Sequence, residues 1–288
     1  MPDLGGRRTR VRPAARGQER QMRILTYNVF GRHGDWPARR AAMRPAVREL
    51  APDLAVLQET VVDDGYDQVV DLLGDGFHVD HQIGRDSDGT GASIASRWPM
   101  RVVRRELLHV TPRVDATEPW IGSVVLARVE APEGVVLLAH FKPSWQFHLA
   151  HERELQAVAA ARMIEDEVAA DPPDHVILAG DFDSTPDSSM MRFWTGRQSL
   201  GDTSVVYRDS WECVRGTAAG LTFVPWNPLR EREQIRHEIG RRIDYILVRY
   251  DRWGPTLAVH SCDRFLDDAV GEVWASDHFG VTADLIRH

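Results

Sequence analysis

Short apolar runs recur from residue 22 to the C-terminus, and no other feature of the chain limits its fold as strongly. Each run is rich in Val, Ile and Leu and is bounded by Gly, Pro or charged residues, a pattern typical of buried β-strands. We expect strands over residues 23–29, 53–60, 91–100, 101–110, 122–130, 134–141, 175–181, 242–249, 256–262 and 279–286. A chain with this many short strands must build its core around β-sheets.

Helical patterns separate some of these strands but not others. The clearest covers residues 149–170, which are rich in helix-forming residues and precede an Asp-Pro-Pro sequence. Further helices are expected over residues 37–50, with Pro45 as a kink or a late start, over 66–75 and near 188–196.

Several predicted strands follow one another directly, as in the hairpin of residues 122–130 and 134–141. Neighbours of this kind pair antiparallel, whereas parallel strands need a long crossover connection. The mixture favours two mixed sheets packed face to face with helices outside. The 288 residues suit one α/β domain, which we place at residues 22–288.

The charge distribution separates the start of the chain from the rest. Residues 1–21 carry six arginines against two acids and lack an apolar segment, so we expect a disordered basic tail. The chain has a net charge of −8, which leaves −12 for the remainder. A domain with this negative charge is not expected to bind nucleic acid tightly and non-specifically. Two cysteines and no apolar span indicate a cytoplasmic protein.

Polar residues stand at the end of many of the apolar runs. In the sequence HVILAGDFD, the run ends in Asp181 and Asp183 with Phe182 between them. Like charges this close raise each other's pKa unless a cation lies nearby. The whole set comprises Asn28, Gln58, Glu59, His140, Asp181, Asp183, Asp244, Asp277 and His278. If the sheets bring these strand ends together, they form one site of carboxylates, imidazoles and amides.

Such a site favours Mg²⁺ or Mn²⁺ as its cofactor. Mg²⁺ prefers oxygen ligands and is usually held by one or two carboxylates together with substrate phosphate. Structural Zn²⁺ would need four Cys or His ligands at set spacings. A hard cation beside His and Asp indicates phosphoester hydrolysis: the metal neutralises phosphate oxygens, a carboxylate positions water and an imidazole handles a proton.

The order of these motifs resembles that of the endonuclease/exonuclease/phosphatase superfamily, whose fold is DNase I-like. The motifs read LTYNVF, PDLAVLQET, GASIASRWPM, LLAHFK, RELQ, ILAGDFDSTPDS, RRIDYILV and SDHFGV. The resemblance implies a four-layer α/β/β/α sandwich of two mixed β-sheets, with the site at one end of both sheets. It also implies a Mg²⁺- or Mn²⁺-dependent phosphoester hydrolase.

The resemblance assigns a role to individual residues. The implied metal ligands are Glu59, Asn28 and Asp277. Asp181 would orient or deprotonate the attacking water. His278 would contact the scissile phosphate, held in its tautomer and orientation by Asp244. His140 would stabilise the transition state or protonate the leaving oxygen.

Each assignment has a simpler alternative that the sequence leaves open. Glu59 could be an ordinary glutamate at a strand end, and His140 a histidine satisfied within the core. Asp244 could serve only as a partner of Arg241 or Arg242.

Asp183 departs from the family pattern, which usually has asparagine at this position. A carboxylate cannot donate a hydrogen bond to phosphate or water unless it is protonated. Asp183 could add a metal ligand, could stay protonated beside Asp181, or could alter the rate or the substrate. We favour an added ligand, with Asp183 among the catalytic residues.

The substrate is either nucleic acid or a small or lipid phosphoester. The loop of residues 220–248 brings several arginines together, which could bind a second phosphate or could be offset by the neighbouring glutamates. Trp145 and Trp226 could stack a base, enter a lipid surface or belong to the core. A sphingomyelinase-like hydrolase and an inactive phosphate-binding module are the alternatives. We expect a monomer without a transmembrane segment.

Overall fold

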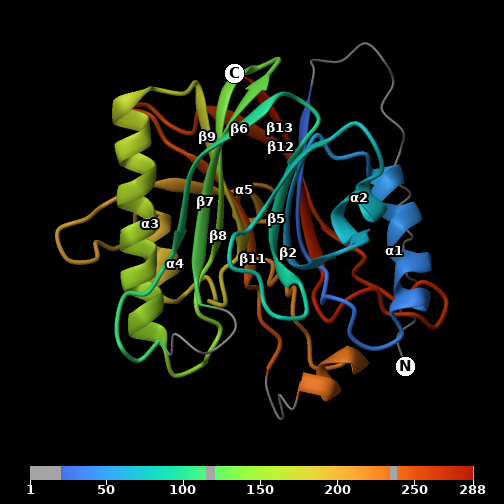
Figure 1. The fold of residues 1–288 in the computed structure, drawn as a ribbon. Coiled ribbons are helices and arrows are strands. Elements are labelled where there is room, and N and C mark those ends of the chain that lie inside the picture. The colour runs from blue at the N-terminus through green and yellow to red at the C-terminus, as the bar shows by residue number, and fades with distance from the viewer. Residues whose placement is uncertain (1–20, 115–120, 234–238, 288) are drawn as a thin grey trace, which may run out of the picture.

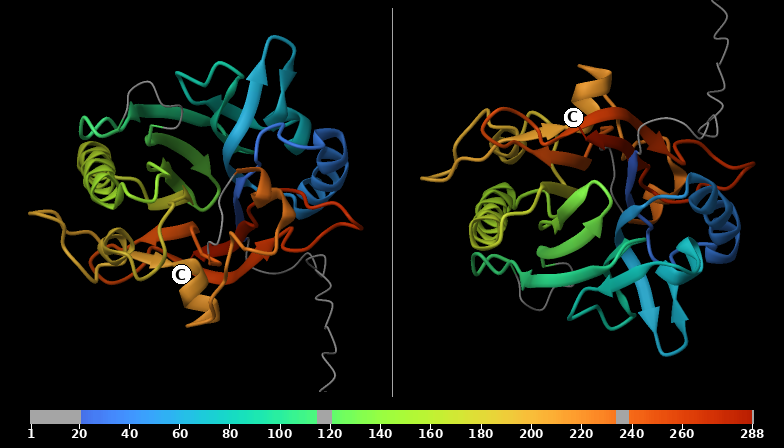
Figure 2. Two further views of the ribbon diagram at one scale, coloured as in Figure 1. Left: turned by 90° about the horizontal axis from the view of Figure 1, so that it is seen from below. Right: turned by 90° about the horizontal axis from the view of Figure 1, so that it is seen from above.

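The computed structural model describes residues 21–114, 121–233 and 239–287. Two β-sheets lie face to face in the centre of the molecule, and helices cover both outer faces (Figure 1). Views along the sandwich show the resulting order of helices, sheet, sheet and helices (Figure 2). The predicted four-layer α/β/β/α sandwich is therefore confirmed. The predicted basic tail lies, apart from Gln21, outside the described residues.

The first sheet has seven strands. Along the sheet they run β12 (Leu257–Phe265), β13 (Gly280–Arg287), β1 (Met22–Asn28), β2 (Leu54–Asp63), β5 (Thr90–Ser96) and β4 (His78–His81), and β3 (Tyr66–Asp67) pairs with β2. Only β1 and β2 are parallel among these pairs, with Asn28 opposite Gln58. The polar ends of β1 and β2 consequently lie together.

The second sheet has six strands. Their order is β10 (Tyr207–Asp209), β11 (Asp244–Arg249), β9 (His175–Asp181), β8 (Gly134–Lys142), β7 (Ser123–Ala131) and β6 (Met100–Leu107). Strands β8 and β9 are parallel, with His140 opposite Ala179, and the other pairs are antiparallel. Antiparallel pairing also places Asp244 opposite Asp181. Both sheets are mixed, as the adjacent strands in the sequence predict.

The four predicted helices are all present. Helix α3 (Ala150–Ala170) confirms the clearest prediction, and α2 (Gln68–Leu73) and α4 (Ser189–Trp194) lie within or near their expected ranges. Helix α1 (Trp36–Leu50) begins at Trp36, where Asp35 accepts a hydrogen bond from the Ala38 amide at 3.1 Å. A late start at Pro45 is therefore wrong, and this proline lies inside the helix, where it removes one backbone donor.

Several short elements had no counterpart in the predicted pattern. They are β3, β4, β10, helix α5 (Ser210–Arg215) and the 3₁₀ helix η1 (Pro228–Glu233). Each is six residues or shorter, a length that shows an apolar period only in part. In the described part of the chain, no helix is both long and apolar enough to cross a bilayer.

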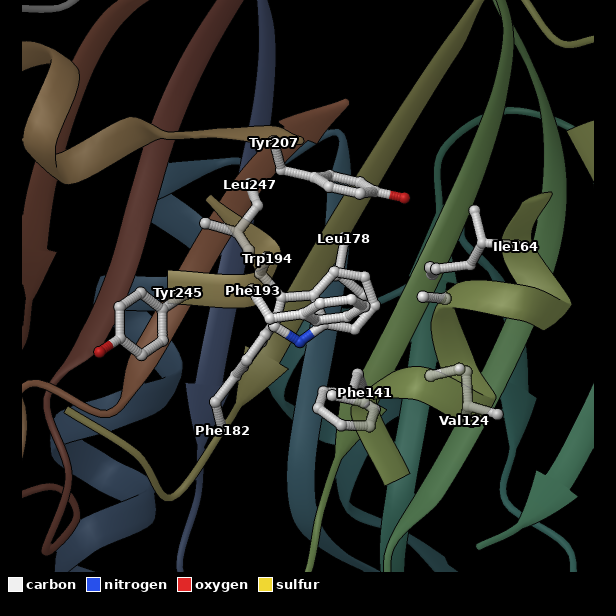
Figure 3. Close-up of a cluster of buried hydrophobic side chains, with 14 of the residues drawn as sticks. Val124, Phe141, Ile164, Leu178, Phe182, Phe193, Trp194, Tyr207, Tyr245 and Leu247 are labelled. Atoms are coloured by element: carbon white, nitrogen blue, oxygen red, sulfur yellow. The ribbon is translucent and has the colours of Figure 1, made fainter. Parts of the chain in front are cut away.

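The hydrophobic core has three layers, one between the two sheets and one beneath the helices on each side. Under α3 and α4, aromatic rings meet edge to face: the ring centroids of Phe141 and Phe182 and of Phe182 and Tyr245 are 5.2 Å apart (Figure 3). Trp194 packs on Phe141 at 5.7 Å. These contacts fix the end of β9, because Phe182 follows its last residue.

Candidate active site

The predicted polar residues gather at one end of the sandwich because of strand alternation. Side chains alternate between the two faces of a strand, so every second residue shares a face. On five strands the face that turns toward the other sheet carries apolar residues along most of its length and polar ones toward one end of the sandwich. These polar residues lie in the last part of β1, β8 and β9, at the β-bulge of β2 and at the first residue of β11. These inward polar residues are Asn28, Gln58, His140, Lys142, Asp181 and Asp244. The inner core thus opens into a polar site where the strands end.

Glu59 reaches this site through a β-bulge. Alternation alone would point it away from the interior, since it directly follows the inward Gln58. The pairing of β2 with β5 shifts register between Leu57 and Thr60, and Glu59 has a φ of 56°. A bulge of this kind re-aims a side chain. Asn28 Nδ2 then donates to Glu59 Oε1 at 2.8 Å.

The two aspartates share the site because Phe182 points the other way. Phe182 is fully buried in the core under α3 and α4, and its amide donates to the Ile243 carbonyl at 2.7 Å. Asp183 has a φ of 49°, a left-handed conformation that aspartate tolerates better than most residues. Its amide donates to Asp181 Oδ1 at 3.2 Å. Both carboxylates accordingly line one pocket.

The cation between these aspartates is Lys142, which is absent from the set of site residues predicted from the sequence. Its Nζ lies 2.8 Å from Asp181 Oδ2 and also contacts Asp183 Oδ2. Burial raises the pKa of Asp181, but Lys142 and His278 outweigh this effect and lower it to about 2. The pKa of Asp183 is raised by burial and by Asp181, against the effect of Lys142.

A signal for Lys142 was present in the sequence. It is the only lysine among 35 Lys and Arg residues, and it stands two positions after His140, on the inward face of the same strand. In the structure the Asp183 carboxylate pairs with this ammonium group, and its role as an added metal ligand stays a prediction.

His278 and Asp244 form the predicted pair. His278 Nδ1 donates to Asp244 Oδ2 at 3.0 Å, and Nε2 faces Asp181 Oδ2, 4.0 Å away. Thr222 Oγ1 accepts from the Asp244 amide at 3.3 Å. Burial lowers the pKa of His278, but the charges of Asp244, Asp181 and Asp277 raise it well above its usual value. Arg242 pairs instead with Asp209, at 2.7 Å.

Asn28 and Asp277 lie beside Glu59. The Asn28 amide nitrogen faces Glu59 and Asp181, and its oxygen accepts from the Phe30 amide at 3.0 Å. In this orientation Asn28 holds Glu59 in place, and its role as a metal ligand stays a prediction. Asp277 lines the same pocket as Glu59, and Ser276 Oγ donates to Asp277 Oδ1 at 3.2 Å.

His140 lies beneath the site rather than in it. It is fully buried, neither ring nitrogen has a hydrogen-bond partner among the described residues, and it is not one of the residues that line the pocket. Burial and the nearby charge of Lys142 lower the pKa of His140 to about 3. A neutral imidazole in this position is poorly suited to protonate a leaving oxygen. The alternative role of His140, stabilisation of the transition state, stays a prediction.

The pocket at this end has a volume of about 250 Å³. Acidic side chains, Lys142 and His278 line its polar part, and Trp145, Phe147 and Phe223 line its apolar part. The guanidinium carbon of Arg241 lies 4.8 Å from the ring centroid of Phe147. The pocket therefore offers aromatic faces and cations close to the carboxylates.

Arg39 joins the loop that follows Asn28 to the loop that contains Asp277. Its buried guanidinium donates to the carbonyl of Ala275 at 2.8 Å, to that of His33 at 2.6 Å and to that of Val29. Ala275 directly precedes Ser276 and Asp277, and Val29 directly follows Asn28. One side chain consequently sets the distance between the loops.

Replacement of Arg39 by methionine is expected to lower the free energy of unfolding by about 3 kcal/mol or more, because it leaves several buried carbonyls without a donor. Denaturant unfolding monitored by circular dichroism measures the change. Arg48→Met is the control, since Arg48 is exposed on the same helix. Equal stability of the two variants would contradict the role assigned to Arg39.

Among the residues that the structure describes, two groups at this end of the sandwich could hold a metal ion. Ligand atoms of Asp181, Asp244 and His278 lie within 4.8 Å of one another, but His278 and Asp244 already engage each other. Glu59 and Asp277 fit a cation better. Burial and the charge of Asp277 raise the pKa of Glu59 to about 7, so a divalent cation would relieve the repulsion between these carboxylates.

The fold and the site together define a class of protein: an α/β sandwich of DNase I-like fold with an acidic and histidine-containing site at one end. The family model described as "Endonuclease/Exonuclease/phosphatase family" matches residues 25–278. The chain belongs to this family. No curated protein matches the chain.

Solved structures show the same fold at low sequence identity. Truncated TDP2 from Caenorhabditis elegans is 15% identical with a TM-score of 0.68, covering 92% of this chain and 97% of its own. TDP2 from D. rerio, complexed with a single-strand DNA product, is 18% identical with a TM-score of 0.65, covering 92% and 98%. A family protein from Bacteroides thetaiotaomicron is 19% identical with a TM-score of 0.66, covering 94% and 96%.

Proposed function

We propose that the protein hydrolyses phosphodiester bonds with the help of a divalent metal ion, Mg²⁺ or Mn²⁺. The observation that carries this proposal is the convergence of two kinds of group on one pocket. Glu59 and Asp277 provide oxygen ligands, and Asp181 and His278 provide a carboxylate and an imidazole only 4.0 Å apart. This combination suits attack of water on phosphorus.

The chain's own residues supply positioning and proton handling. With a pKa of about 2, Asp181 is ionised at neutral pH and accepts a hydrogen bond from the attacking water. The raised pKa of His278 keeps its imidazole protonated on both ring nitrogens, so Nδ1 donates to Asp244 and Nε2, directed toward the pocket, donates to a phosphate oxygen. When bound, the metal would neutralise charge on the phosphate and would be held by Glu59 and Asp277.

A nucleic acid end or another diester with an aromatic group suits the apolar part of the pocket. Trp145 and Phe147 are 39% and 48% exposed beside it, and exposed aromatic rings stack on bases. One structural neighbour was solved with a single-strand DNA product, which agrees with this substrate class. The exposed Trp226 favours a lipid phosphodiester as the second candidate, since tryptophan also inserts into lipid surfaces.

Hydrolysis of two simple esters tests the proposal. We expect turnover of bis(p-nitrophenyl) phosphate to exceed that of p-nitrophenyl phosphate, to stop in EDTA and to return with Mg²⁺ or Mn²⁺. Absence of metal-dependent turnover of either ester would refute the proposal. A short single-stranded oligonucleotide and sphingomyelin vesicles, assayed in parallel, then separate the nucleic acid candidate from the lipid one.

Replacement of Glu59 by glutamine is expected to weaken binding of Mn²⁺. The loss should be at least about 10–100-fold, the effect that removal of even a supporting residue around a metal commonly has. Isothermal titration calorimetry with Mn²⁺ measures it without any need for turnover. The control is Glu130→Gln, an exposed glutamate. If Glu59→Gln binds Mn²⁺ as tightly as the control, Glu59 is not a ligand.

A further inference from the structure

The only lysine of the chain lies in the candidate active site. All other basic side chains among its 35 Lys and Arg residues are arginines. Lys142 is 8% exposed, lines the pocket and contacts both Asp181 and Asp183. Lysine differs from arginine in carrying a compact charge with three donors on a flexible stem. The position of this single lysine therefore points to a specific use of its ammonium group.

The contacts of the ammonium group leave one donor for the pocket. An ammonium has three N–H bonds, and two of them meet Asp181 Oδ2 and Asp183 Oδ2. Within the described residues, the structure provides no third acceptor for Nζ. Because Lys142 lines the pocket, the third N–H is available to a ligand there.

Asp183 holds the ammonium in this position. Its left-handed backbone, with a φ of 49°, turns its carboxylate back toward the end of β8. The aspartates also keep the ammonium charged: burial lowers the pKa of Lys142, but Asp181 and Asp183 outweigh burial and raise it. Arginine would present a planar fork of five donors at the same place, which a site with two fixed acceptors and one ligand oxygen does not require.

We propose that Lys142 is a catalytic residue that binds the scissile phosphate, donating its third N–H to a non-bridging oxygen, and that Asp183 is the positioning residue for this ammonium. The inference rests on the proposed phosphodiesterase function. In this arrangement Asp183 binds the phosphate only through Lys142, which supplies the hydrogen-bond donor that a carboxylate lacks. Positive charge next to the phosphate then comes partly from the chain itself.

Kinetics of three variants separate this role from simple charge balance. Lys142→Met is expected to lower kcat/KM for bis(p-nitrophenyl) phosphate by about 100-fold, as expected for loss of a donor to the transition state. Lys142→Met/Asp183→Ala removes the ammonium and one buried acid together without adding a new donor, so it should fold and yet remain equally slow. Recovery of activity in the double variant would show that Lys142 only neutralises the aspartates. Arg162→Met, which removes an exposed cation, is the control.

Nuclear magnetic resonance provides a readout that does not depend on turnover. Protein labelled with ¹⁵N on the lysine side chain has one ammonium signal, because the chain has one lysine. We expect inorganic phosphate, titrated at constant ionic strength with Mg²⁺ or with EDTA, to shift this signal. A signal that stays unchanged in both conditions would overturn the proposal even if hydrolysis is confirmed. A shifted signal in a protein without phosphodiesterase activity would refute the proposed function but not phosphate binding.

Asp183 is tested by the same signal and by inhibition. Asp183→Ala removes the acceptor of the ammonium, whereas Asp183→Asn keeps an amide oxygen there. The inhibition constant of phosphate should rise more in the alanine variant than in the asparagine variant, with a parallel change in the ammonium shift. Equal inhibition constants in both variants and the wild type would reduce Asp183 to a structural role.

Discussion

Replacement of Asp181 by asparagine is expected to lower kcat for phosphodiester hydrolysis by about 10³–10⁴-fold, the upper part of the range for loss of a proton-handling side chain. Asp181 receives hydrogen bonds from Lys142, from Asn28 and from the Asp183 amide, so its carboxylate is fixed and ionised. Asparagine preserves the shape but not the charge, and it cannot accept the proton of the attacking water.

Steady-state kinetics with bis(p-nitrophenyl) phosphate measure this loss. Asp187→Asn is a matched control, because Asp187 is an exposed aspartate in the loop that follows β9 and does not line the pocket. The change in KM should be smaller than the change in kcat, since Asp181 acts on water directly and on the substrate only through its contact with Lys142. A loss smaller than tenfold would mean that another group positions the water.

Replacement of His278 by alanine is expected to lower kcat by about 10³-fold, as the transition state loses a buried donor at a phosphate oxygen. The imidazole is 5% exposed, is fixed by Asp244 at 3.0 Å and packs on Phe223 with ring centroids 4.9 Å apart. These contacts place Nε2 in the pocket before any substrate arrives, so the effect should fall on kcat.

His278→Asn separates chemistry from packing, because the asparagine amide keeps a donor but not the imidazole. The asparagine variant should regain part of the lost rate if hydrogen-bond donation is the function of His278. His260→Ala removes an exposed histidine and is the control. Thermal unfolding of all variants shows whether a loss of rate follows from a loss of structure. A His278→Ala enzyme with nearly normal kcat would restrict this residue to a structural role.

Strand alternation explains how much of the site could be predicted. Asn28 and Asp181 each end an apolar run at an inward position and Asp244 begins one, so their convergence could be predicted once two facing sheets were assumed. The pairing of Asp244 with His278 came from the family resemblance, and the structure places the two side chains in contact. Most strands and the long helix α3 were predicted for the same reason, namely a clear apolar period.

Other parts depend on tertiary structure that no local pattern reports. Glu59 lies in the site only because a bulge reverses its direction, and the bulge is a property of the pairing between β2 and β5. His140 and Lys142 lie on the same inward face of β8, but His140 is farther from the end of the sandwich. It is therefore enclosed in the core, whereas Lys142 lines the pocket. The Arg39 contacts join residues more than 200 positions apart, a distance at which spacing in the chain carries no information.

Burial of Phe182 determines when Asp181 and Asp183 become fixed in position. This ring joins the aspartates to the aromatic core, and it is fully buried (Figure 3). A segment anchored in this way opens only with the surrounding core, unlike a surface loop that frays by itself. The conformational entropy of aligning Asp181 and Asp183 is therefore lost when the chain folds, and substrate binding has no such loss to overcome. Affinity for the substrate then depends on the contacts made in the pocket, and much less on ordering the acids.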